Sequence, residues 1–364
     1  MKKIALFTTF FSTNGVSRNR ITLANEFISM GYAVDFVVCR DEGVLKDEVS
    51  EQSKIFELGS SRPREMVLRL GQYLKNEKPH AMIASSWPNT ASAILARYIF
   101  HRQMKLIVSE HSNFLNAPEM TKRDKWLLRH VSRYLYRYAT QVVVVSDGMK
   151  AGMCDVTGLD ESDIKVIYNP LRQLKKTILS DTDAELIDWW RSSKTVLSVG
   201  RLEKAKDYEI LIDAFALVQK NINAKLVILG EGGLRDKLEQ TIKRYNLNDS
   251  IKLPGFRKDT ASFYDNAELF VLSSNNEGFG NVILESLSHG VPVVSTDCES
   301  GPREILVDGK YGKLCDVGSV DRLAASMIES LNQAHDPEFL KQRANDFSPR
   351  KIAQQYIEAL FGLG

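Results

Sequence analysis

Short apolar runs alternate with helical patterns along the whole chain, and this alternation constrains the fold more than any other feature. The expected strands are residues 4–8, 33–38, 81–84, 106–109 and 141–145 in the first half and 196–199, 225–229, 251–253, 269–272 and 292–295 in the second. These runs are apolar on both faces and a helical stretch follows each, which is typical of parallel strands joined by crossover helices. The pattern therefore predicts an α/β protein with two doubly wound parallel sheets. Ligands of such sheets bind at the carboxyl ends of the strands, so we expect the site in the loops that follow them, around a common cleft.

A polar stretch, residues 172–193, separates the two sets of strands and follows Asn169 and Pro170. We place the domain junction there, with an N-terminal domain of residues 1–170 and a C-terminal domain of residues 190–348. The last amphipathic segment, residues 349–361, has no strand after it, so we expect residues 349–364 to cross back onto the first domain. A length of 364 residues fits two domains of ordinary size.

The composition argues against several classes of protein. The net charge is only +2, which gives no reason to expect a nucleic-acid partner, although basic side chains outnumber acidic ones in residues 1–170. The apolar runs are far shorter than the roughly 18 residues of a membrane span, and the run at residues 4–7 is too short for a signal peptide. The four cysteines are widely spaced and form no C-x-x-C pair. These features favour a reduced, cytoplasmic protein without a structural zinc site.

The strongest motif is the segment NEGFGNVILE at residues 276–285, where the strand 269–272 gives way to a helix. Glycines at a helix start leave backbone N–H groups bare, and such groups bind anionic oxygens. We expect Glu277 in the loop and Glu285 about one turn inside the helix. One carboxylate can then hold hydroxyls at the reacting end of a ligand while the other holds a ribose. The alternative is an ordinary helix start with a surface glutamate at each end.

Two further loops follow predicted strands of the second half. In VGRLEKAKD, residues 199–207, Arg201 and Lys206 can both reach a diphosphate, arginine as a planar fork and lysine as a point charge. The alternative is two solvated charges. The segment LGEGGLR, residues 229–235, begins like a dinucleotide-binding fingerprint, but Arg235 stands where its last glycine belongs. We therefore expect a tight turn that opens a helix over 234–245, with its backbone near a nucleoside.

Two residues of the first half belong to the same kind of loop. Gly15 follows the opening strand and would let the backbone approach a phosphate closely, although a plain turn explains it equally well. His111 follows the strand 106–109, which places it at the rim of the expected cleft. A catalytic and a structural role are both open for it.

Two segments carry a functional and an ordinary interpretation side by side. Asp181-Thr182-Asp183 has the D-x-D form that can hold Mg²⁺ or Mn²⁺, but no strand precedes it, so helix capping is the better explanation. The segment KRDKWLLRHVSRYLYRY, residues 122–138, repeats a basic residue every four positions, with aromatic and aliphatic residues between. Such a helix suits an anionic membrane surface. The alternative is an ordinary packed helix with a solvated face.

With these residues in place, the chain resembles glycosyltransferase family 4, a large family of retaining enzymes with the GT-B fold. The resemblance covers essentially the whole length. It rests on GRL at residues 200–202 with Lys206, LGEG at 229–232, LPGF at 253–256, the glutamates at 277 and 285, and GPREI at 301–305. The fold implied is two Rossmann-like domains that face a central cleft, the first binding the acceptor and the second the nucleotide sugar, with a C-terminal helix crossing back.

The resemblance also implies roles for site residues in the second domain. Arg201 and Lys206 match the pair that holds the donor diphosphate. Glu277 matches the glutamate that contacts the donor sugar, and Glu285 matches the one that binds the ribose.

Further donor contacts are implied beside these four. Arg257 falls where main-chain groups usually hold the base. Backbone positions next to the sugar and phosphates are matched by Phe279, Gly280 and Asn281.

In the first domain, His111 matches a histidine near the reacting carbon and Gly15 matches the glycine of the first loop. The family often has Gly-Gly in that loop. Asn14-Gly15 departs from that pattern, so the phosphate contact expected there is weakened.

The GPREI segment, with STDC at residues 295–298 before it, is similar to bacterial enzymes that extend lipid-linked oligosaccharides for surface polysaccharides. We therefore expect a retaining hexosyltransferase that moves a hexose or N-acetylhexosamine from a UDP-sugar to a lipid-linked glycan. No metal or other cofactor is expected, because Arg201, Lys206 and helix N-terminal amides would neutralise the leaving diphosphate. The alternatives are an epimerase or inverting transferase on the same fold, a nucleotide-binding dehydrogenase, and a non-catalytic sugar-binding protein.

Overall fold

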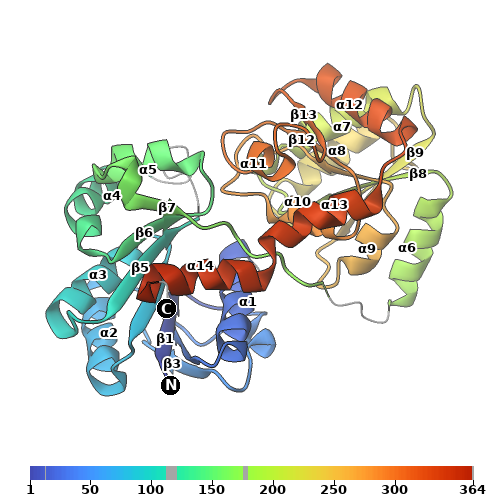
Figure 1. Ribbon diagram of the computed structural model, residues 1–364. Helices are drawn as coiled ribbons and strands as arrows, with labels where there is room; N and C mark the ends of the chain where they lie inside the picture. The colour runs from blue at the N-terminus through green and yellow to red at the C-terminus, as the bar shows by residue number, and fades with distance from the viewer. Residues whose placement is uncertain (13, 112–120, 175–178, 363–364) are drawn as a thin grey trace. The chain divides into compact units, whose positions relative to one another are not determined.

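The computed structural model describes residues 1–12, 14–111, 121–174 and 179–362 and divides into two compact units (Figure 1). One unit comprises Met1–Arg172 with Phe347–Gly364, and the other comprises Gln173–Asp346. The division falls at the start of the polar stretch, and the chain returns to the first unit through its last helix. Within the described parts of the chain, each helix is too short or too polar to cross a bilayer.

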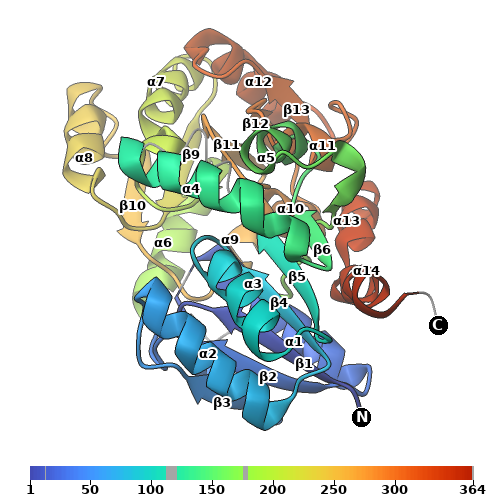
Figure 2. The same cartoon turned by 90° about the vertical axis from the view of Figure 1, so that its left-hand side faces the viewer.

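The first unit contains a seven-stranded parallel sheet in the order β3-β2-β1-β4-β5-β6-β7. Its strands are β1 (Lys3–Thr8), β2 (Ala33–Val38), β3 (Lys54–Glu57), β4 (Ala81–Ser85), β5 (Lys105–Glu110), β6 (Gln141–Val144) and β7 (Ile164–Val166). Its helices are α1 (Gly15–Ser29), α2 (Pro63–Glu77), α3 (Asn89–Phe100), α4 (Lys122–Leu135), α5 (Met149–Thr157) and α14 (Pro349–Phe361). Helices α1 and α14 cover one face of the sheet, and α2 and α3 lie side by side on the other (Figures 1 and 2).

Helix α14 is part of the core of the first unit. Ile352, Tyr356 and Leu360 are buried among residues of β1, α1 and β2. The ring of Phe361 stacks on Tyr32 with centroids 6.0 Å apart. Burial of several large side chains is worth a few kcal/mol each. The expected return of the C-terminal helix onto the first domain is therefore confirmed.

The second unit contains a six-stranded parallel sheet in the order β10-β9-β8-β11-β12-β13. Its strands are β8 (Lys194–Val199), β9 (Ala224–Leu229), β10 (Ile251–Gly255), β11 (Leu269–Leu272), β12 (Val293–Thr296) and β13 (Lys313–Cys315). Its helices are α6 (Asp181–Arg191), α7 (Tyr208–Val218), α8 (Arg235–Arg244), α9 (Ala261–Asp265), α10 (Asn281–Ser288), α11 (Pro302–Leu306), α12 (Val320–Asn332) and α13 (Pro337–Ala344). Helices α7, α8 and α12 lie on one face of the sheet, with α9, α10 and α13 on the other (Figure 1).

Both sheets therefore have the doubly wound order that the alternation predicted. All ten predicted strands are present, with ends within two residues of those expected. The strands that the sequence analysis missed, β3, β7 and β13, lie at sheet edges, and each has only three or four residues. An edge strand is covered less completely than a central one, so it lacks the continuous apolar run that marks a central strand.

The strand order reverses once in each sheet, between β1 and β4 in the first unit and between β8 and β11 in the second. Crossover helices leave in opposite directions from such a switch point, and ligands of doubly wound sheets bind outside the carboxyl ends of the strands there. The loops after β8 and β11, and those after β1 and β4, are therefore the first places to examine.

Candidate active site

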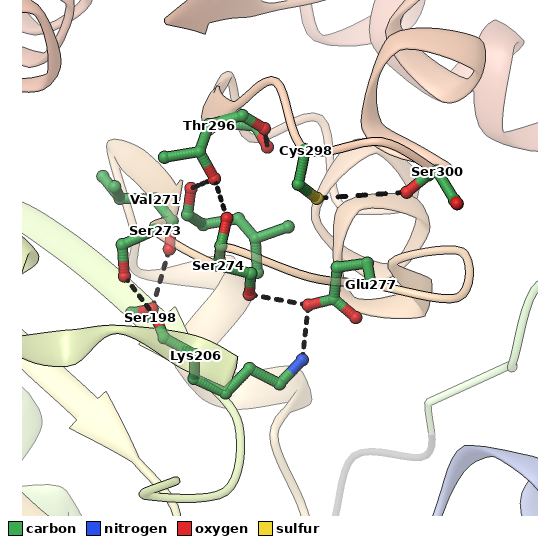
Figure 3. Close-up of polar contacts among 11 residues, drawn as sticks. Ser198, Lys206, Val271, Ser273, Ser274, Glu277, Thr296, Cys298 and Ser300 are labelled. Carbon is green, nitrogen blue, oxygen red and sulfur yellow. Dashed lines mark hydrogen bonds and ion pairs between the residues drawn. The ribbon is translucent and has the colours of Figure 1, made fainter. Parts of the chain in front are cut away.

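The switch point of the second sheet brings Lys206 and Glu277 together (Figure 3). Lys206 ends a 3-10 turn after β8, and Glu277 lies in the loop between β11 and α10. The lysine Nζ lies 2.5 Å from Oε1 of Glu277, and the two side chains are only 21% and 11% exposed. Ser274 Oγ donates to the same carboxylate oxygen at 2.7 Å. One basic and one acidic group are thus held next to each other with little solvent access.

Hydroxyl groups fasten the two loops to each other. Ser273 Oγ donates to the backbone oxygen of Lys206 at 2.8 Å, and Thr296 Oγ1 donates to the backbone oxygen of Ser274 at 2.5 Å (Figure 3). Ser198 Oγ donates to the backbone oxygen of Val271 at 2.7 Å. These three hydroxyl side chains are almost fully buried. The position of the Lys206–Glu277 pair is therefore set by a rigid, buried support.

Arg201, the expected partner of Lys206, is placed differently. Its side chain is 70% exposed and pairs with Glu203 at 2.8 Å. An exposed pair of this kind contributes little to stability, so the guanidinium can turn toward a ligand at low cost. Of these two basic side chains, only that of Lys206 belongs to the half-buried cluster.

Glu285 lies one turn inside α10 and is 8% exposed. The hydroxyl of the fully buried Tyr264 donates to its Oε2 at 3.1 Å. A tyrosine that donates to a carboxylate fixes the orientation of that carboxylate. Tyr264 belongs to the short helix α9, and nothing in the sequence pattern marked it as a partner of Glu285.

The start of α10 depends on two glycines. Gly280 occupies the N-cap position with φ 96°, and Asn281 is the first helical residue. Gly301 has φ 92°, and a Cβ added there would lie 1.8 Å from the carbonyl oxygen of Phe279. Only glycine permits this contact between the loops after β11 and β12. Helix α10 therefore begins close to the carboxyl end of the sheet.

A second glycine contact explains the LGEG segment. Gly230 has φ 148°, and a Cβ added there would lie 1.9 Å from the carbonyl oxygen of Gly200. Its N–H donates to the oxygen of Gly255 at 3.0 Å. These glycines let the loops after β8, β9 and β10 touch through their backbones. The tight turn that was expected to open a helix is present, and α8 begins at Arg235.

The D-x-D segment takes part in an ion pair, and a different residue caps the helix. Ser180 caps α6 by accepting a hydrogen bond from the N–H of Asp183, so capping by the aspartates themselves was wrong. The carboxylate of Asp183 accepts from Nε of Arg257 at 2.8 Å, and Arg257 Nη1 also donates to the oxygen of Pro254 at 2.7 Å. Among the described residues, no cluster of three or more His, Cys, Asp or Glu side chains is arranged to hold a metal ion.

In the first unit, His111 follows directly after β5, and Gly15 is the exposed first residue of α1. The side chain of Asn14 caps α1 by accepting from the N–H of Ser17 at 2.9 Å. Nε2 of His111 lies 2.9 Å from Nη2 of Arg20 and 3.1 Å from Oγ of Ser109. Burial, and then the positive charge of Arg20, hold the pKa of His111 well below its usual value.

The neighbouring Glu110 points to the opposite face of the sheet. Its Oε1 accepts hydrogen bonds from the hydroxyls of Thr90 and Tyr136, and burial raises its pKa to about 7. Successive residues of a strand point to opposite faces, so adjacent positions 110 and 111 belong to two separate polar clusters.

Helix α4 has one buried side and one exposed side. The buried side consists of Leu128, Ser132 and Tyr136. Tyr136 lies in the 3-10 turn Tyr136–Tyr138 that follows the helix. On the exposed side, Trp126 is 60% and Tyr134 is 66% exposed. Exposed arginines alternate with these aromatic rings. The helix is thus packed on one side and presents aromatic and basic side chains together to solvent on the other.

Two family models match this chain. "Glycosyl transferases group 1" matches residues 189–347 and "Glycosyltransferase Family 4" matches residues 13–172. The chain belongs to the family 4 glycosyltransferases. It is 27% identical, over the full length of both chains, to the N-acetylgalactosamine-N,N'-diacetylbacillosaminyl-diphospho-undecaprenol 4-alpha-N-acetylgalactosaminyltransferase of Campylobacter jejuni. It is 26% identical to the amylovoran biosynthesis glycosyltransferase AmsD of Erwinia amylovora, over 79% of this chain and 80% of that one.

Solved structures give the fold of this glycosyltransferase. Anabaena HepE in complex with UDP and glucose matches all of both chains with a TM-score of 0.82 at 22% identity. The sucrose-phosphate synthase of Thermosynechococcus elongatus covers 98% of each chain with a TM-score of 0.79 at 20% identity. The fold is GT-B, as the resemblance implied.

Sequence reasoning missed three polar residues in the two sites of this glycosyltransferase: Arg20, Tyr264 and Ser274. A signal existed for two of them. Ser274 lies just after a strand, at the carboxyl end where ligands of such sheets bind. Arg20 places a charge on the apolar face of α1. Tyr264 carries no such signal, because a tyrosine in a helix is ordinary core material.

Proposed function

We propose that this glycosyltransferase transfers a hexose or N-acetylhexosamine from a UDP-sugar to a hydroxyl of a lipid-linked glycan, with retention of configuration, in the assembly of a bacterial surface polysaccharide. The observation that carries the proposal is the half-buried pair of Lys206 and Glu277 at the switch point of the second sheet. A cation suits the diphosphate of the donor, and the carboxylate beside it suits the sugar that gains positive charge as the diphosphate leaves.

Each donor group has a residue of matching chemistry. Lys206 and Arg201 bind the diphosphate, helped by the backbone N–H groups at the start of α10. Glu277 holds the sugar, and Glu285, oriented by Tyr264, holds the ribose.

The remaining assigned residues complete the donor site. Phe279, Gly280 and Asn281 supply backbone contacts beside the sugar and phosphates, and the loop around Arg257 holds the base. We also assign His111 to a sugar contact and Gly15 to a phosphate contact. No metal is required, because the basic side chains and backbone amides carry the countercharge.

The reaction exchanges one bond at the anomeric carbon. The bond to the diphosphate oxygen breaks, the acceptor hydroxyl forms a bond on the same face, and the leaving phosphate takes the hydroxyl proton. The Glu277 carboxylate accepts both Lys206 and Ser274 at one oxygen, which favours electrostatic stabilisation of the sugar over nucleophilic attack by that group.

The acceptor side of the proposal rests on α4 and on the relatives. The Campylobacter relative is named for a diphospho-undecaprenol substrate, which is a lipid. Exposed Trp126, Leu127 and Tyr134, interleaved with arginines, suit the interface of an anionic membrane where such a lipid resides. We therefore assign residues 122–138 to peripheral membrane contact.

The donor is tested by thermal shift with UDP, GDP and ADP, followed by UDP release from a panel of UDP-sugars with and without lipid-linked acceptors. We expect a preference for UDP and release that depends on the acceptor. A preference for GDP or ADP would overturn the donor assignment, and acceptor-independent conversion of the sugar would indicate an epimerase.

The membrane contact is tested by cosedimentation with vesicles of phosphatidylglycerol or phosphatidylcholine. We expect binding to the anionic vesicles alone, reduced by Trp126→Ser with Tyr134→Ser. Leu68→Ser on α2 is the matched control, because Leu68 is also an exposed apolar residue of the first unit, at 65% exposure. Equal loss in the control, or no binding by the unchanged protein, would remove α4 from the proposal.

A further inference from the structure

The first unit contains a fully buried arginine, Arg20 on α1, at 0% exposure. Its Nε donates to Oγ of Ser85 at 2.6 Å, its Nη2 lies 2.9 Å from Nε2 of His111, and its guanidinium lies 5.5 Å from the ring centre of Tyr356. Among the described residues, Arg20 forms no ion pair with an acidic side chain, and its Nη1 is buried without a hydrogen-bond partner. A buried charge without a countercharge costs stability, and an apolar side chain would pack there more cheaply. A stabilising role therefore does not account for an arginine at this position.

The chemistry of the guanidinium decides the protonation of His111. A guanidinium carries only donors, so Nε2 of the imidazole must accept the hydrogen bond. An imidazole that accepts at Nε2 is neutral and carries its proton on Nδ1. In the protonated ring, or in the other tautomer, two N–H groups would face each other at 2.9 Å.

The surroundings of the ring agree with this state. The titratable and charged groups described around it are Arg20 from α1 and, through the hydroxyl of Ser109, Tyr356 from α14 at 3.3 Å. Glu110 points to the other face of the sheet and bonds to Thr90. Burial and the Arg20 charge both hold the pKa of His111 low.

The proton on Nδ1 has no acceptor of its own. Nδ1 of His111 is buried and makes no hydrogen bond within the described structure. His111 lies at the carboxyl end of β5, next to the switch point of the first sheet, where ligands of this fold bind. Nδ1–H is thus a donor without an acceptor at the end of the sheet where ligands bind, and it can donate a hydrogen bond to an oxygen of the substrate.

We propose that Arg20 is a positioning residue: it fixes His111 as the neutral Nδ1–H tautomer, so that Nδ1 donates a hydrogen bond to an oxygen of the bound sugar. This role rests on the proposed glycosyl transfer for the identity of the ligand. It also makes His111 a donor and not a general base, because its only acceptor nitrogen is already occupied.

The tautomer is measured directly, without any substitution, by nitrogen-15 NMR of protein labelled at histidine. We expect His111 to show a protonated Nδ1 and an unprotonated Nε2 from pH 6 to pH 8. A protonated Nε2, or a titration within that range, would overturn the proposal. The result does not depend on which donor the enzyme uses, so it can fail or succeed separately from the proposed function.

Variants separate positioning from a merely structural role. In Arg20→Met, the hydroxyl of Ser109 can accept from Nε2, so we expect the Nε2–H tautomer to appear and transfer to fall about tenfold, the effect of one lost hydrogen bond. Arg20→Lys retains a group that only donates, so we expect it to restore both the tautomer and most of the activity. Arg18→Met, a change of the same kind on the same helix, is the control and should leave the His111 signals unchanged.

The outcomes are exclusive. Loss of activity in Arg20→Met with an unchanged tautomer, or a changed tautomer with unchanged transfer, would each refute positioning. If Arg20→Met does not fold, the NMR spectrum of the unchanged protein and the Arg20→Lys variant still decide. If the tautomer is as expected but no sugar is transferred from any donor, the proposed function fails while the Arg20–His111 arrangement stands.

Discussion

Replacing Glu277 by glutamine should have two opposite effects. We expect kcat to fall by at least about 100-fold, the range for loss of one preorganised electrostatic group. We also expect UDP to bind more tightly, because Glu277 binds Lys206 and competes with the diphosphate for it. A substitution that strengthens nucleotide binding while it slows transfer is the signature of this arrangement.

The gain in affinity follows from the contact at 2.5 Å between Nζ of Lys206 and Oε1 of Glu277. A hydrogen bond to a charged group is worth about 1.5–3 kcal/mol and a neutral one about 0.5–1.5 kcal/mol. Glutamine keeps an oxygen acceptor for Lys206 and Ser274 but loses the charge. The difference of about 1 kcal/mol corresponds to roughly fivefold tighter binding of UDP.

The affinity is measured by titration calorimetry with UDP, and kcat is measured with the best donor of the panel. Glu203→Gln is the matched control: it also removes one carboxylate charge, from the loop after β8 that carries Lys206, but the pair of Glu203 with the 70% exposed Arg201 is weak. We expect the control to change UDP affinity less than twofold. Weaker or unchanged UDP binding in Glu277→Gln, or full activity, would show that Glu277 does not restrain Lys206.

Four further results are expected. Arg201→Ala or Lys206→Ala should each weaken UDP binding by more than tenfold, since each loses a charge-assisted contact; calorimetry that shows no change in both would place the diphosphate elsewhere. EDTA should leave turnover intact, and strict dependence on Mg²⁺ or Mn²⁺ would contradict the charge balance proposed. Glu285→Gln should weaken UDP and UDP-sugar alike with kcat near normal, and Tyr264→Phe should act in the same direction more weakly, as donor KM and kcat would reveal. The pKa of Glu110, about 7 in the folded protein, lies above its unfolded value, so this carboxyl destabilises the fold increasingly as pH rises from 4.5 to 7, by about 3 kcal/mol in total. Glu110→Gln should therefore have a higher melting temperature than the unchanged protein at pH 8 but not at pH 4.5, and equal pH dependence of the two would refute this.

The central strands could be predicted because their residues are buried on both faces, which leaves a continuous apolar run in the sequence. The run at residues 33–38 matches β2 residue for residue. The edge strand β3 reads Lys54–Glu57, with charged ends and half-exposed centres, and a loop could have the same composition. Exposure therefore explains which strands were missed.

The candidate site could be predicted only in part. The loop motifs located Lys206, Glu277 and Glu285, because glycines and charges at a strand end are local features. They did not predict that Lys206 binds Glu277 while Arg201 stays exposed. That outcome depends on the buried hydroxyls that fasten the two loops, and their partners are distant in sequence.

The sequence alone determined the two parallel sheets, their central strands and the loops where the chemistry lies, because burial patterns and glycine-rich turns are properties of short segments. Only the tertiary structure decided which side chains meet. Lys206 and Glu277 are 71 residues apart, and Arg20 and His111 are 91 apart. The first pair lies where the strand order reverses between β8 and β11, and the second joins α1 to the residue after β5. Which strands are neighbours is set by the packing of the whole sheet. No local sequence pattern indicates which residues so far apart in the chain come into contact. The ion pair of the second unit and the contact of the buried arginine in the first are therefore known only from the fold.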